Sequence, residues 1–513
     1  MKIKNIIFRG VAVAAMAVAA SCSEDYLETE PEGTVQESDV NDVMTADPAK
    51  VQSYVTGMQM NLYCGGDYWT THDDFGLPAT RLATELWCED VAFSINQQWF
   101  CYDYQLDNRL GDYRRTNGVW NQMYLVVDNA NQIITMLKPA EGEEVTDKTS
   151  RAILGEAYAT RAYAYYMLIN LWQHPYSVAA DAPGVPLKTE DVYRQERVPV
   201  KEIYAQILSD IELGYNYLKG LGYHSGNKVG LSEYAAAGIY ANVLMFTGDY
   251  ANAAKYAELA IAGGSFNSEQ DMLSGFNSLD MPEVIWGYNV TNETTGYYAS
   301  FFSHIDSYTF GYSGMGYGKL ISSDLLSKID ENDVRKKWFG YNAEYNVAEN
   351  NTFAVENAYG WLPYVQNKFR DSYSATGGNA EPFTSAIIYT RIAEMYLVAA
   401  EAYFLNGDEA NAKEMLNTLM VTRNSAYNCI LSGNDLYEEI CLQKRIETWM
   451  EGCRVFDAKR RDEVIDRTVS TNHTSMADKP YSARSALFIF RIPTKELQNN
   501  PAITEDDDNP VTD

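Results

Sequence analysis

Apolar side chains recur every three or four residues over several long stretches of this chain, which is the pattern of amphipathic helices. One such face is formed by Trp120, Tyr124, Val127 and Ile134. A second helix is expected over 151–172, and a third over 200–218 begins after Pro199 as its antiparallel partner. The dominant period therefore predicts a mainly α fold.

Two segments have the order helix, Gly-Asp turn, helix. The first covers 231–262 and breaks at Gly248-Asp249, and the second covers 389–423 and breaks at Gly407-Asp408. Glycine ends the first helix of each pair and aspartate caps the second. Small residues allow close helix contact at Ala235, Ala237, Ala241, Ala253, Ala257, Ala399, Ala402 and Ala410.

A repeat length of roughly 34 residues with this layout is typical of tetratricopeptide units. Two looser pairs are expected, 114–137 with 151–172, and 200–218 with its neighbours. We therefore predict a single helical superdomain of about four tetratricopeptide-like pairs, with a few short strands.

The stretches 263–318 and 340–388 are rich in Gly, Asn, Ser, Thr and Tyr. They are too long for simple connectors, so we expect functional loops carried on the helices. A strand is expected over 283–288. The chain accordingly divides into an N-terminal helical region, 22–262, and a C-terminal region with loop insertions, 263–513.

The N-terminus has the pattern of a bacterial lipoprotein signal. Lys2 and Lys4 precede an apolar run over 11–20 that is too short to span a bilayer, and small residues lead into Cys22. This pattern predicts removal of residues 1–21 and lipid attachment to the Cys22 thiol. The alternative is an ordinary secretory signal with an incidental cysteine.

Charge and composition restrict the partners. There are 40 Lys and Arg against 70 Asp and Glu, a net charge of −30 without a basic block. Nucleic acid binding needs clustered cations, so this class of partner is excluded. The remaining six cysteines form no CxxC motif, and either free thiols or disulfides fit. No metal, cofactor or catalytic signature occurs, although a calcium ion at 67–74 stays open.

Seven motifs in one order carry a family resemblance. They are CSEDYLETEP over 22–31, GEAYATRAYAYY over 155–166, VPL over 185–187 with RVPV over 197–200, DVR over 333–335, the segment 391–402, the segment 445–460, and the ending 492–501. Together they resemble the SusD/RagB family of outer-membrane glycan-binding lipoproteins over nearly the whole chain. The usual aromatic residue before Glu447 and the usual QNPG-type ending are altered here.

The resemblance implies a lipid-anchored protein on the outer surface of the outer membrane. It implies a non-catalytic role in which the protein captures an oligosaccharide and acts as the lid of a SusC-like TonB-dependent transporter. Three alternatives remain open: a surface glycoside hydrolase, a relative that captures peptides, and a scaffold that binds protein.

Sugar binding requires exposed aromatic planes with polar groups beside them. Two loop regions have this composition, 67–74 with 96–100, and 297–317. The predicted platforms are Trp69, Trp99, Tyr298, Tyr312 and Tyr317, and the predicted hydroxyl partners are Asp73, Asn96 and Gln98. Trp120, Tyr124, Trp172, Trp286 and Tyr396 are instead expected in the core.

A dense charge cluster is expected on one helix near the C-terminus. Its members are Arg445, Glu447, Glu451, Arg454, Asp457 and Arg460. A glycosidase would use a carboxylate pair at a fixed separation. We favour a buried ion-pair network that ties the helix to its neighbours, and we expect the same role for Arg391 with Glu394.

Overall fold

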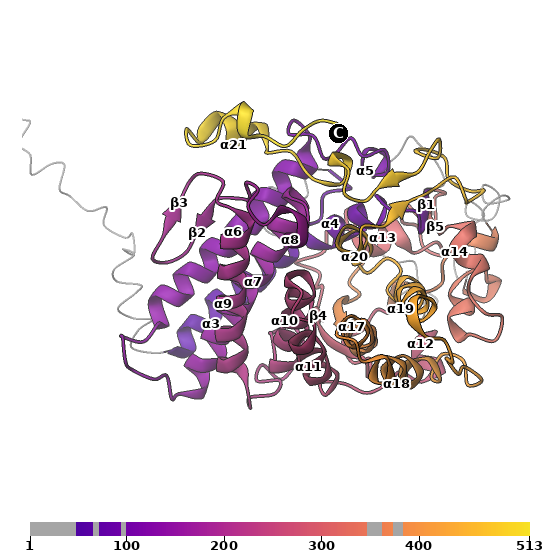
Figure 1. Cartoon of the computed structure of the whole chain (residues 1–513), viewed down its shortest axis with the longest axis horizontal. Coiled ribbons are helices and arrows are strands. Elements are labelled where there is room, and N and C mark those ends of the chain that lie inside the picture. Colours follow the sequence, from indigo (N-terminus) through magenta and orange to yellow (C-terminus); the bar gives the residue numbers. More distant parts are fainter. Residues whose placement is uncertain (1–47, 65–70, 94–98, 346–361, 373–382, 513) are drawn as a thin grey trace, which may run out of the picture. The chain divides into compact units, whose positions relative to one another are not determined.

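Helices dominate the fold and neighbouring helices of the sequence pack side by side (Figure 1). The computed structural model describes residues 48–64, 71–93, 99–345, 362–372 and 383–512. Residues from Ala49 onward belong to one compact unit. The expected mainly α class is confirmed, whereas the division at 262/263 stays a prediction.

The longer helices carry the scaffold. They are α3 (Pro48–Cys64), α4 (Leu77–Glu85), α6 (Arg114–Leu137), α7 (Lys148–Trp172), α9 (Val200–Leu218), α10 (Glu233–Thr247), α11 (Tyr250–Ile261), α17 (Ile392–Leu405), α18 (Glu409–Met420), α19 (Gly433–Glu447) and α20 (Arg454–Arg461). Shorter helices are α5 (Cys101–Tyr104), α8 (Tyr176–Ala179), α12 (Glu269–Met272), α13 (Phe301–Ile305), α14 (Ser323–Ser327) and α21 (Thr494–Asn499). Single 3₁₀ turns are η2 (Val334–Trp338), η3 (Ala343–Tyr345), η4 (Leu362–Tyr364), η5 (Ala486–Phe488) and η6 (Glu505–Asp507).

Strands of the described residues form four antiparallel two-stranded ladders. They are β1 (Val91–Phe93) with β5 (Lys319–Ile321), β2 (Leu187–Lys188) with β3 (Tyr193–Arg194), β4 (Val284–Tyr288) with β6 (Ile387–Arg391), and β7 (Val464–Ile465) with β8 (Tyr481–Ser482). The expected strand over 283–288 is therefore confirmed as β4.

The predicted helical pairs are present. Helix α6 packs on α7, α7 on α9, α10 on α11, and α17 on α18. Both Gly-Asp turns have the expected geometry, because Gly248 and Gly407 adopt φ of 81° and 84°. Asp249 and Asp408 then accept hydrogen bonds from the third residue beyond each cap, at 3.3 and 3.1 Å.

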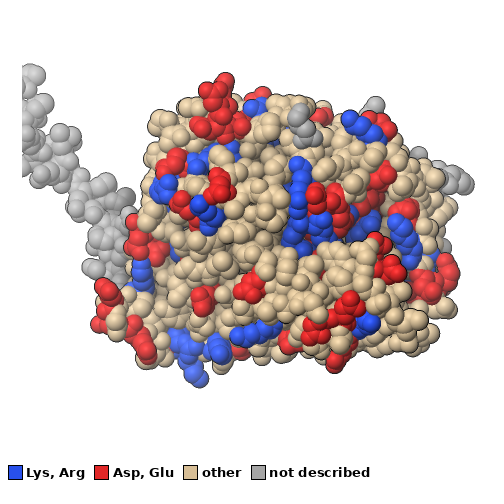
Figure 2. Space-filling view, viewed as in Figure 1, with Lys and Arg blue, Asp and Glu red and all other residues tan. Residues whose placement is uncertain are grey.

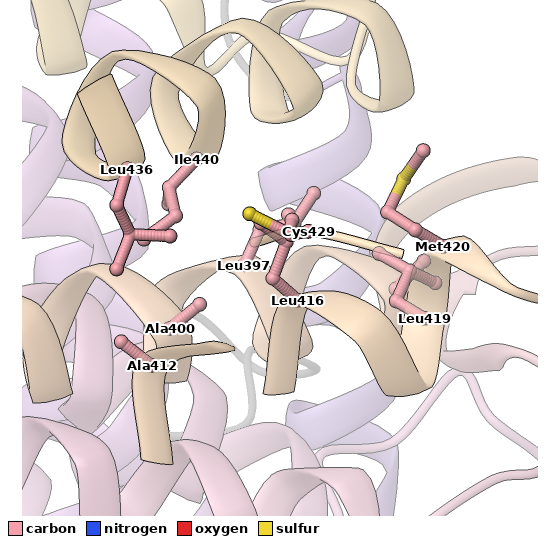
Figure 3. Close-up of a cluster of buried hydrophobic side chains, with 10 residues drawn as sticks. Leu397, Ala400, Ala412, Leu416, Leu419, Met420, Cys429, Leu436 and Ile440 are labelled. Atoms are coloured by element: carbon pink, nitrogen blue, oxygen red, sulfur yellow. The ribbon is translucent and has the colours of Figure 1, made fainter. Parts of the chain in front are cut away.

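The C-terminal pair shows how alanine permits close packing (Figure 3). Leu397 and Ala400 of α17 meet Ala412 and Leu416 of α18, and α19 covers them with Ile440. The predicted contact alanines are buried, with one exception. Ala410 is exposed, because the helix phase set by the Asp408 cap turns Ala412 inward instead.

One predicted helix begins later than the pattern suggested. Residues 389–391 belong to β6, and α17 begins only at Ile392. The run Ile387-Ile388-Tyr389-Thr390 consists of residues that favour strands, and it pairs with β4.

Trp120, Trp172 and Trp286 are buried, as expected, and Tyr124 and Tyr396 are partly buried. All six cysteines of the described chain are free thiols.

The charge cluster is a buried ion-pair network, as predicted, but it does not lie on one helix. Glu447 ends α19, and Met450 and Gly452 then adopt positive φ, so the chain reverses before α20. Arg391 pairs with Glu283, Glu447 and Glu451 rather than with Glu394, at 2.6–3.0 Å. Glu394 instead accepts a hydrogen bond from Asn242.

Glu447 is the centre of this network. Its carboxylate contacts Arg335, Arg391 and Arg423, and all four side chains are fully buried. Burial alone would raise the pKa of Glu447, but the three guanidinium groups lower it well below its ordinary value. Ion pairs of the network thus join η2, β6, the turn after α18 and α19.

We expect Glu447→Gln to lower the free energy of unfolding by about 3–5 kcal/mol, because it leaves buried arginines without their shared counter-ion. Urea denaturation followed by circular dichroism measures the change. Glu414→Gln on the exposed face of α18 is the control and should change stability little. Equal stabilities for the two variants would contradict the assigned role of Glu447.

Candidate functional site

Two loops that are distant in sequence meet because β1 pairs with β5. Phe93 at the end of β1 lies opposite Lys319 at the start of β5. The chain leaving β1 leads to Trp99, and the chain entering β5 comes from Tyr317. The ladder therefore brings together the two regions in which the sequence placed the sugar-binding aromatics.

Aromatic rings from both regions form one cluster. The rings of Trp99, Tyr298 and Tyr312 lie 5.4, 6.2 and 5.5 Å from the ring of His72, between centroids. Tyr317 lies 6.2 Å from Tyr312. His72 is exposed and the other four rings are partly exposed, so the cluster has a surface that a ligand can reach. We call these five residues the aromatic platform.

Hydrogen bonds and ring stacking attach the platform to two buried residues beneath it, His304 and Lys319. The hydroxyl of Tyr312 and Nδ1 of His72 share one hydrogen bond. Nε2 of buried His304, in α13, bonds to the carbonyl of His72 at 2.6 Å, and its ring stacks under Tyr312 at 4.9 Å. Lys319 of β5 lies 3.4 Å from the other His304 nitrogen. These contacts therefore hold the loop at His72, helix α13 at His304 and strand β5 at Lys319 next to one another.

A tight turn sets the position of Tyr312. A side chain on Gly311 would lie 2.6 Å from the backbone of Ser303, and one on Gly314 would lie 1.8 Å from the carbonyl of Thr309. Only glycine fits these close approaches. The Tyr312 amide also donates to the Ser303 hydroxyl at 3.3 Å. The ring is therefore presented by a packed loop rather than by a loose one.

Asp73 lies next to the platform but is buried. Its carboxylate accepts hydrogen bonds from Thr71 and Arg114 at 2.8 and 2.7 Å, and it is only 4% exposed. Burial would raise its pKa, but Arg115 and Arg114 lower it below the ordinary value. Arg114 keeps 45% of its side chain exposed and is the accessible polar group of this pair.

Three predicted site residues, Trp69, Asn96 and Gln98, lie outside the described residues, as does Cys22. Sequence reasoning missed His72 and His304. His72 lies in the same loop as Asp73, which was a usable signal, whereas His304 carried none because its role depends on the β1–β5 pairing. Among the described residues, no group of three His, Cys, Asp or Glu side chains could hold a metal ion.

The fold and the site define a class: a stacked-helix scaffold that presents aromatic rings on inserted loops. Two family models match the sequence, one described as starch-binding associating with outer membrane, over residues 25–245, and one described as the SusD family, over 288–510. The chain belongs to the SusD/RagB family. No curated protein matches the sequence.

Solved structures share the fold. A SusD-like carbohydrate binding protein from Bacteroides vulgatus is 22% identical, with a TM-score of 0.75 over 90% of this chain and 97% of its own. A SusD superfamily protein from Bacteroides thetaiotaomicron is 21% identical, with a TM-score of 0.74 over 90% and 99%. Surface glycan-binding protein A from the same species, solved with laminarihexaose, is 16% identical, with a TM-score of 0.64 over 88% and 98%.

The model that matches residues 25–245 is described as starch-binding and associating with the outer membrane, so family membership supports surface glycan binding as the class of function. Within the described part of the chain, no helix has the length and apolar character needed to cross a bilayer.

The buried Lys319 beneath the platform predicts that the stability of the protein depends on pH. Burial lowers the pKa of Lys319 from 10.5 to about 7, so the unfolded chain binds an extra proton between these values. Lys319 should therefore contribute an increase in the free energy of unfolding as pH is raised from 7 towards 10.5. Lys319→Met removes the titrating group, so the variant should gain less stability than the wild type over this range in urea denaturation. Identical slopes for wild type and variant would show that Lys319 keeps its ordinary pKa.

Proposed function

We propose that this protein captures oligosaccharides at the cell surface on the aromatic platform, without cleaving them, and delivers them to a SusC-like TonB-dependent transporter. The observation that carries the proposal is the convergence of His72, Trp99, Tyr298 and Tyr312 on one partly exposed surface. Such rings can stack on the CH faces of sugars. Family membership supports the transporter as partner.

The expected affinity is modest. Covering one sugar face of roughly 50 Å² at ~25 cal/mol/Å² contributes about 1 kcal/mol. Several faces and hydrogen bonds together correspond to roughly millimolar to micromolar dissociation constants. Arg114 is the exposed member of its ion pair with Asp73. We therefore propose that the Arg114 guanidinium donates hydrogen bonds to the ligand hydroxyls, while buried Asp73 holds the guanidinium in place. Trp69, Asn96, Gln98 and Tyr317 remain proposed ligand contacts.

The carboxylates beside the platform support binding without catalysis. A glycosidase needs two carboxyl groups that flank the bond to be cleaved. Asp73 and Asp74 follow His72 directly, but both are buried and both lie within 4 Å of the Arg114 guanidinium. Their negative charges are therefore compensated by Arg114 within the protein, and their buried carboxylates do not face a substrate.

Replacing Trp99 and Tyr312 by Ala should weaken glycan binding at least about tenfold, because each ring contributes roughly 1 kcal/mol of stacking. Affinity electrophoresis in gels containing starch, laminarin, xylan or pectin measures retardation. Tyr193→Ala is the matched control, since Tyr193 is 60% exposed on β3 and lies outside the platform. The Tyr193→Ala variant should keep the wild-type melting curve, and the Trp99→Ala, Tyr312→Ala protein should keep the wild-type far-ultraviolet circular dichroism spectrum.

The possible results separate the alternatives. Unchanged retardation of the Trp99 and Tyr312 variants contradicts the platform as the binding site. Released sugar product points to a glycoside hydrolase. Migration without retardation in every gel favours a peptide-capturing relative or a scaffold.

Lipid anchoring at Cys22 gives a separate prediction. Cys22→Ser removes the thiol that would receive the acyl chains, so the protein should move from the membrane fraction to the soluble fraction. Mass spectrometry of the wild-type N-terminal peptide should show the added acyl mass. A membrane-bound Cys22→Ser protein would contradict anchoring at this residue.

A further inference from the structure

Two tyrosine rings contact each other on the surface of the protein, outside the five residues of the aromatic platform. Tyr102 of α5 is 52% exposed, and Tyr113, the residue before α6, is partly exposed. Their ring centroids lie 5.6 Å apart and their planes meet at 63°. Side chains of both charges are interspersed on the face of the molecule in Figure 2, whereas this pair is aromatic. Aromatic surface that stays exposed in one place marks a candidate binding surface.

The chain connects this pair to the platform on both sides. Tyr102 follows Trp99 of the platform by three residues, so their Cα atoms are at most about 11 Å apart. Tyr113 directly precedes Arg114, whose guanidinium donates a hydrogen bond to Asp73 at 2.7 Å. Asp73 belongs to the loop that carries the platform histidine. The pair is therefore a neighbour of the platform, with Arg114 between them.

The charge of Asp73 acts on both surfaces. Burial raises the pKa of the Tyr312 hydroxyl and of the Cys101 thiol, and the negative charge of Asp73 adds to both increases. Tyr312 belongs to the platform, and Cys101 is the first residue of α5, next to Tyr102. Helix α4 packs on α5, on α6 and on α13, the helix beneath the platform. One carboxylate and one helix are thus close to the platform and to the tyrosine pair.

A buried ion pair fixes the position of the two rings relative to each other. Arg115 donates two hydrogen bonds of 3.0 Å to the carboxylate of Asp103, and both side chains are buried. Asp103 directly follows Tyr102, and Arg115 is the second residue after Tyr113. The carbonyl of Tyr102 also accepts a hydrogen bond from the amide of Asp107 at 2.8 Å. Rings that are already held in place reduce the entropic cost of binding a ligand.

Polar groups lie beside the two rings. Arg114 keeps 45% of its side chain exposed. Asp107 is partly exposed, and its negative charge adds to the effect of burial in raising the pKa of the Tyr113 hydroxyl, so its carboxylate is near that ring. A sugar that stacks on one tyrosine would therefore have a hydrogen-bond donor and an acceptor for its hydroxyl groups.

We propose that Tyr102 and Tyr113 form a further sugar subsite, so that a bound glycan extends from the platform across Arg114 to these rings. The inference rests on the proposed function and specifies its ligand as a chain of several sugars. The occupant follows from continuity, because a chain bound on the platform meets Arg114 and then this pair. Each additional sugar face that is covered strengthens binding, so affinity should increase with chain length until the pair is reached.

The test is isothermal titration calorimetry of the purified protein with oligosaccharides of two, four, six and eight sugars, prepared from starch, laminarin, xylan and pectin. In a series that the wild type binds, the dissociation constant should fall as the chain lengthens. Replacing Tyr102 and Tyr113 by Ala should weaken binding of the longest chains about fivefold and leave binding of the shortest bound chain unchanged. Trp99→Ala, Tyr312→Ala should instead weaken binding at every length.

Two controls accompany this pair of substitutions. Tyr102→Phe, Tyr113→Phe keeps both rings and should retain the length dependence of the wild type. Tyr193→Ala removes an exposed ring outside both surfaces and should bind like the wild type. The far-ultraviolet circular dichroism spectrum of each variant should match that of the wild type, because the ion pair between Arg115 and Asp103 is intact.

The results separate failure of the subsite from failure of the proposed function. Equal dissociation constants for the wild type and the Tyr102→Ala, Tyr113→Ala variant at every length would overturn the subsite alone and leave the pair to a protein partner. An equal loss at every length would contradict a separate subsite, because the rings would then belong to the contact made by the shortest chain. Absence of binding in all four series would contradict the subsite and the proposed function together.

Discussion

The shared burial of Glu447 among three arginines is the constraint on which the rest of the molecule depends. Arg335, Arg391 and Arg423 come from separate segments, and each has no exposure to solvent. Removing one of these charges leaves the others buried without a partner, which is strongly destabilising. The network therefore ties together segments that are far apart in the sequence.

This network is connected to the platform through α4. Arg81 of α4 donates hydrogen bonds to the carbonyls of Ile388 and Tyr389 in β6 and to that of Glu451 beside the network. Helix α4 begins five residues after His72, at the positive-φ position of Gly76. Helix α4 therefore contacts the segments that carry the network and begins in the loop that carries the exposed His72 ring.

The sequence allowed much of this fold to be predicted, because helical periodicity and Gly-Asp turns are local signals. The helical pairs, the buried network and the two aromatic loop regions all follow from such signals or from the family resemblance. The start of α17 was placed too early, since pairing of 389–391 with β4 overrides helical propensity. Ala410 and the single-helix charge cluster were wrong for similar reasons, because a cap and a positive-φ turn shift the helix phase.

Long-range geometry could not be predicted in the same way. That Asp73 faces inward to Arg115 and that His304 lies beneath Tyr312 depend on contacts between segments far apart in sequence. Composition identified which loops carry rings, but the ladder between Val91–Phe93 and Lys319–Ile321 decides that the rings share one surface.

That short ladder has a consequence for how ligand preference can change over evolutionary time. Because the ladder and the packed Gly311 and Gly314 fix the backbone of the loop that carries Tyr312, the ring at this position can be exchanged without a change in the course of the described chain. A rigid frame of this kind also spares an incoming ligand the entropic cost of ordering loops, so that weak individual contacts suffice for recognition. Diversity of ligand and constancy of architecture are then compatible in a single protein family.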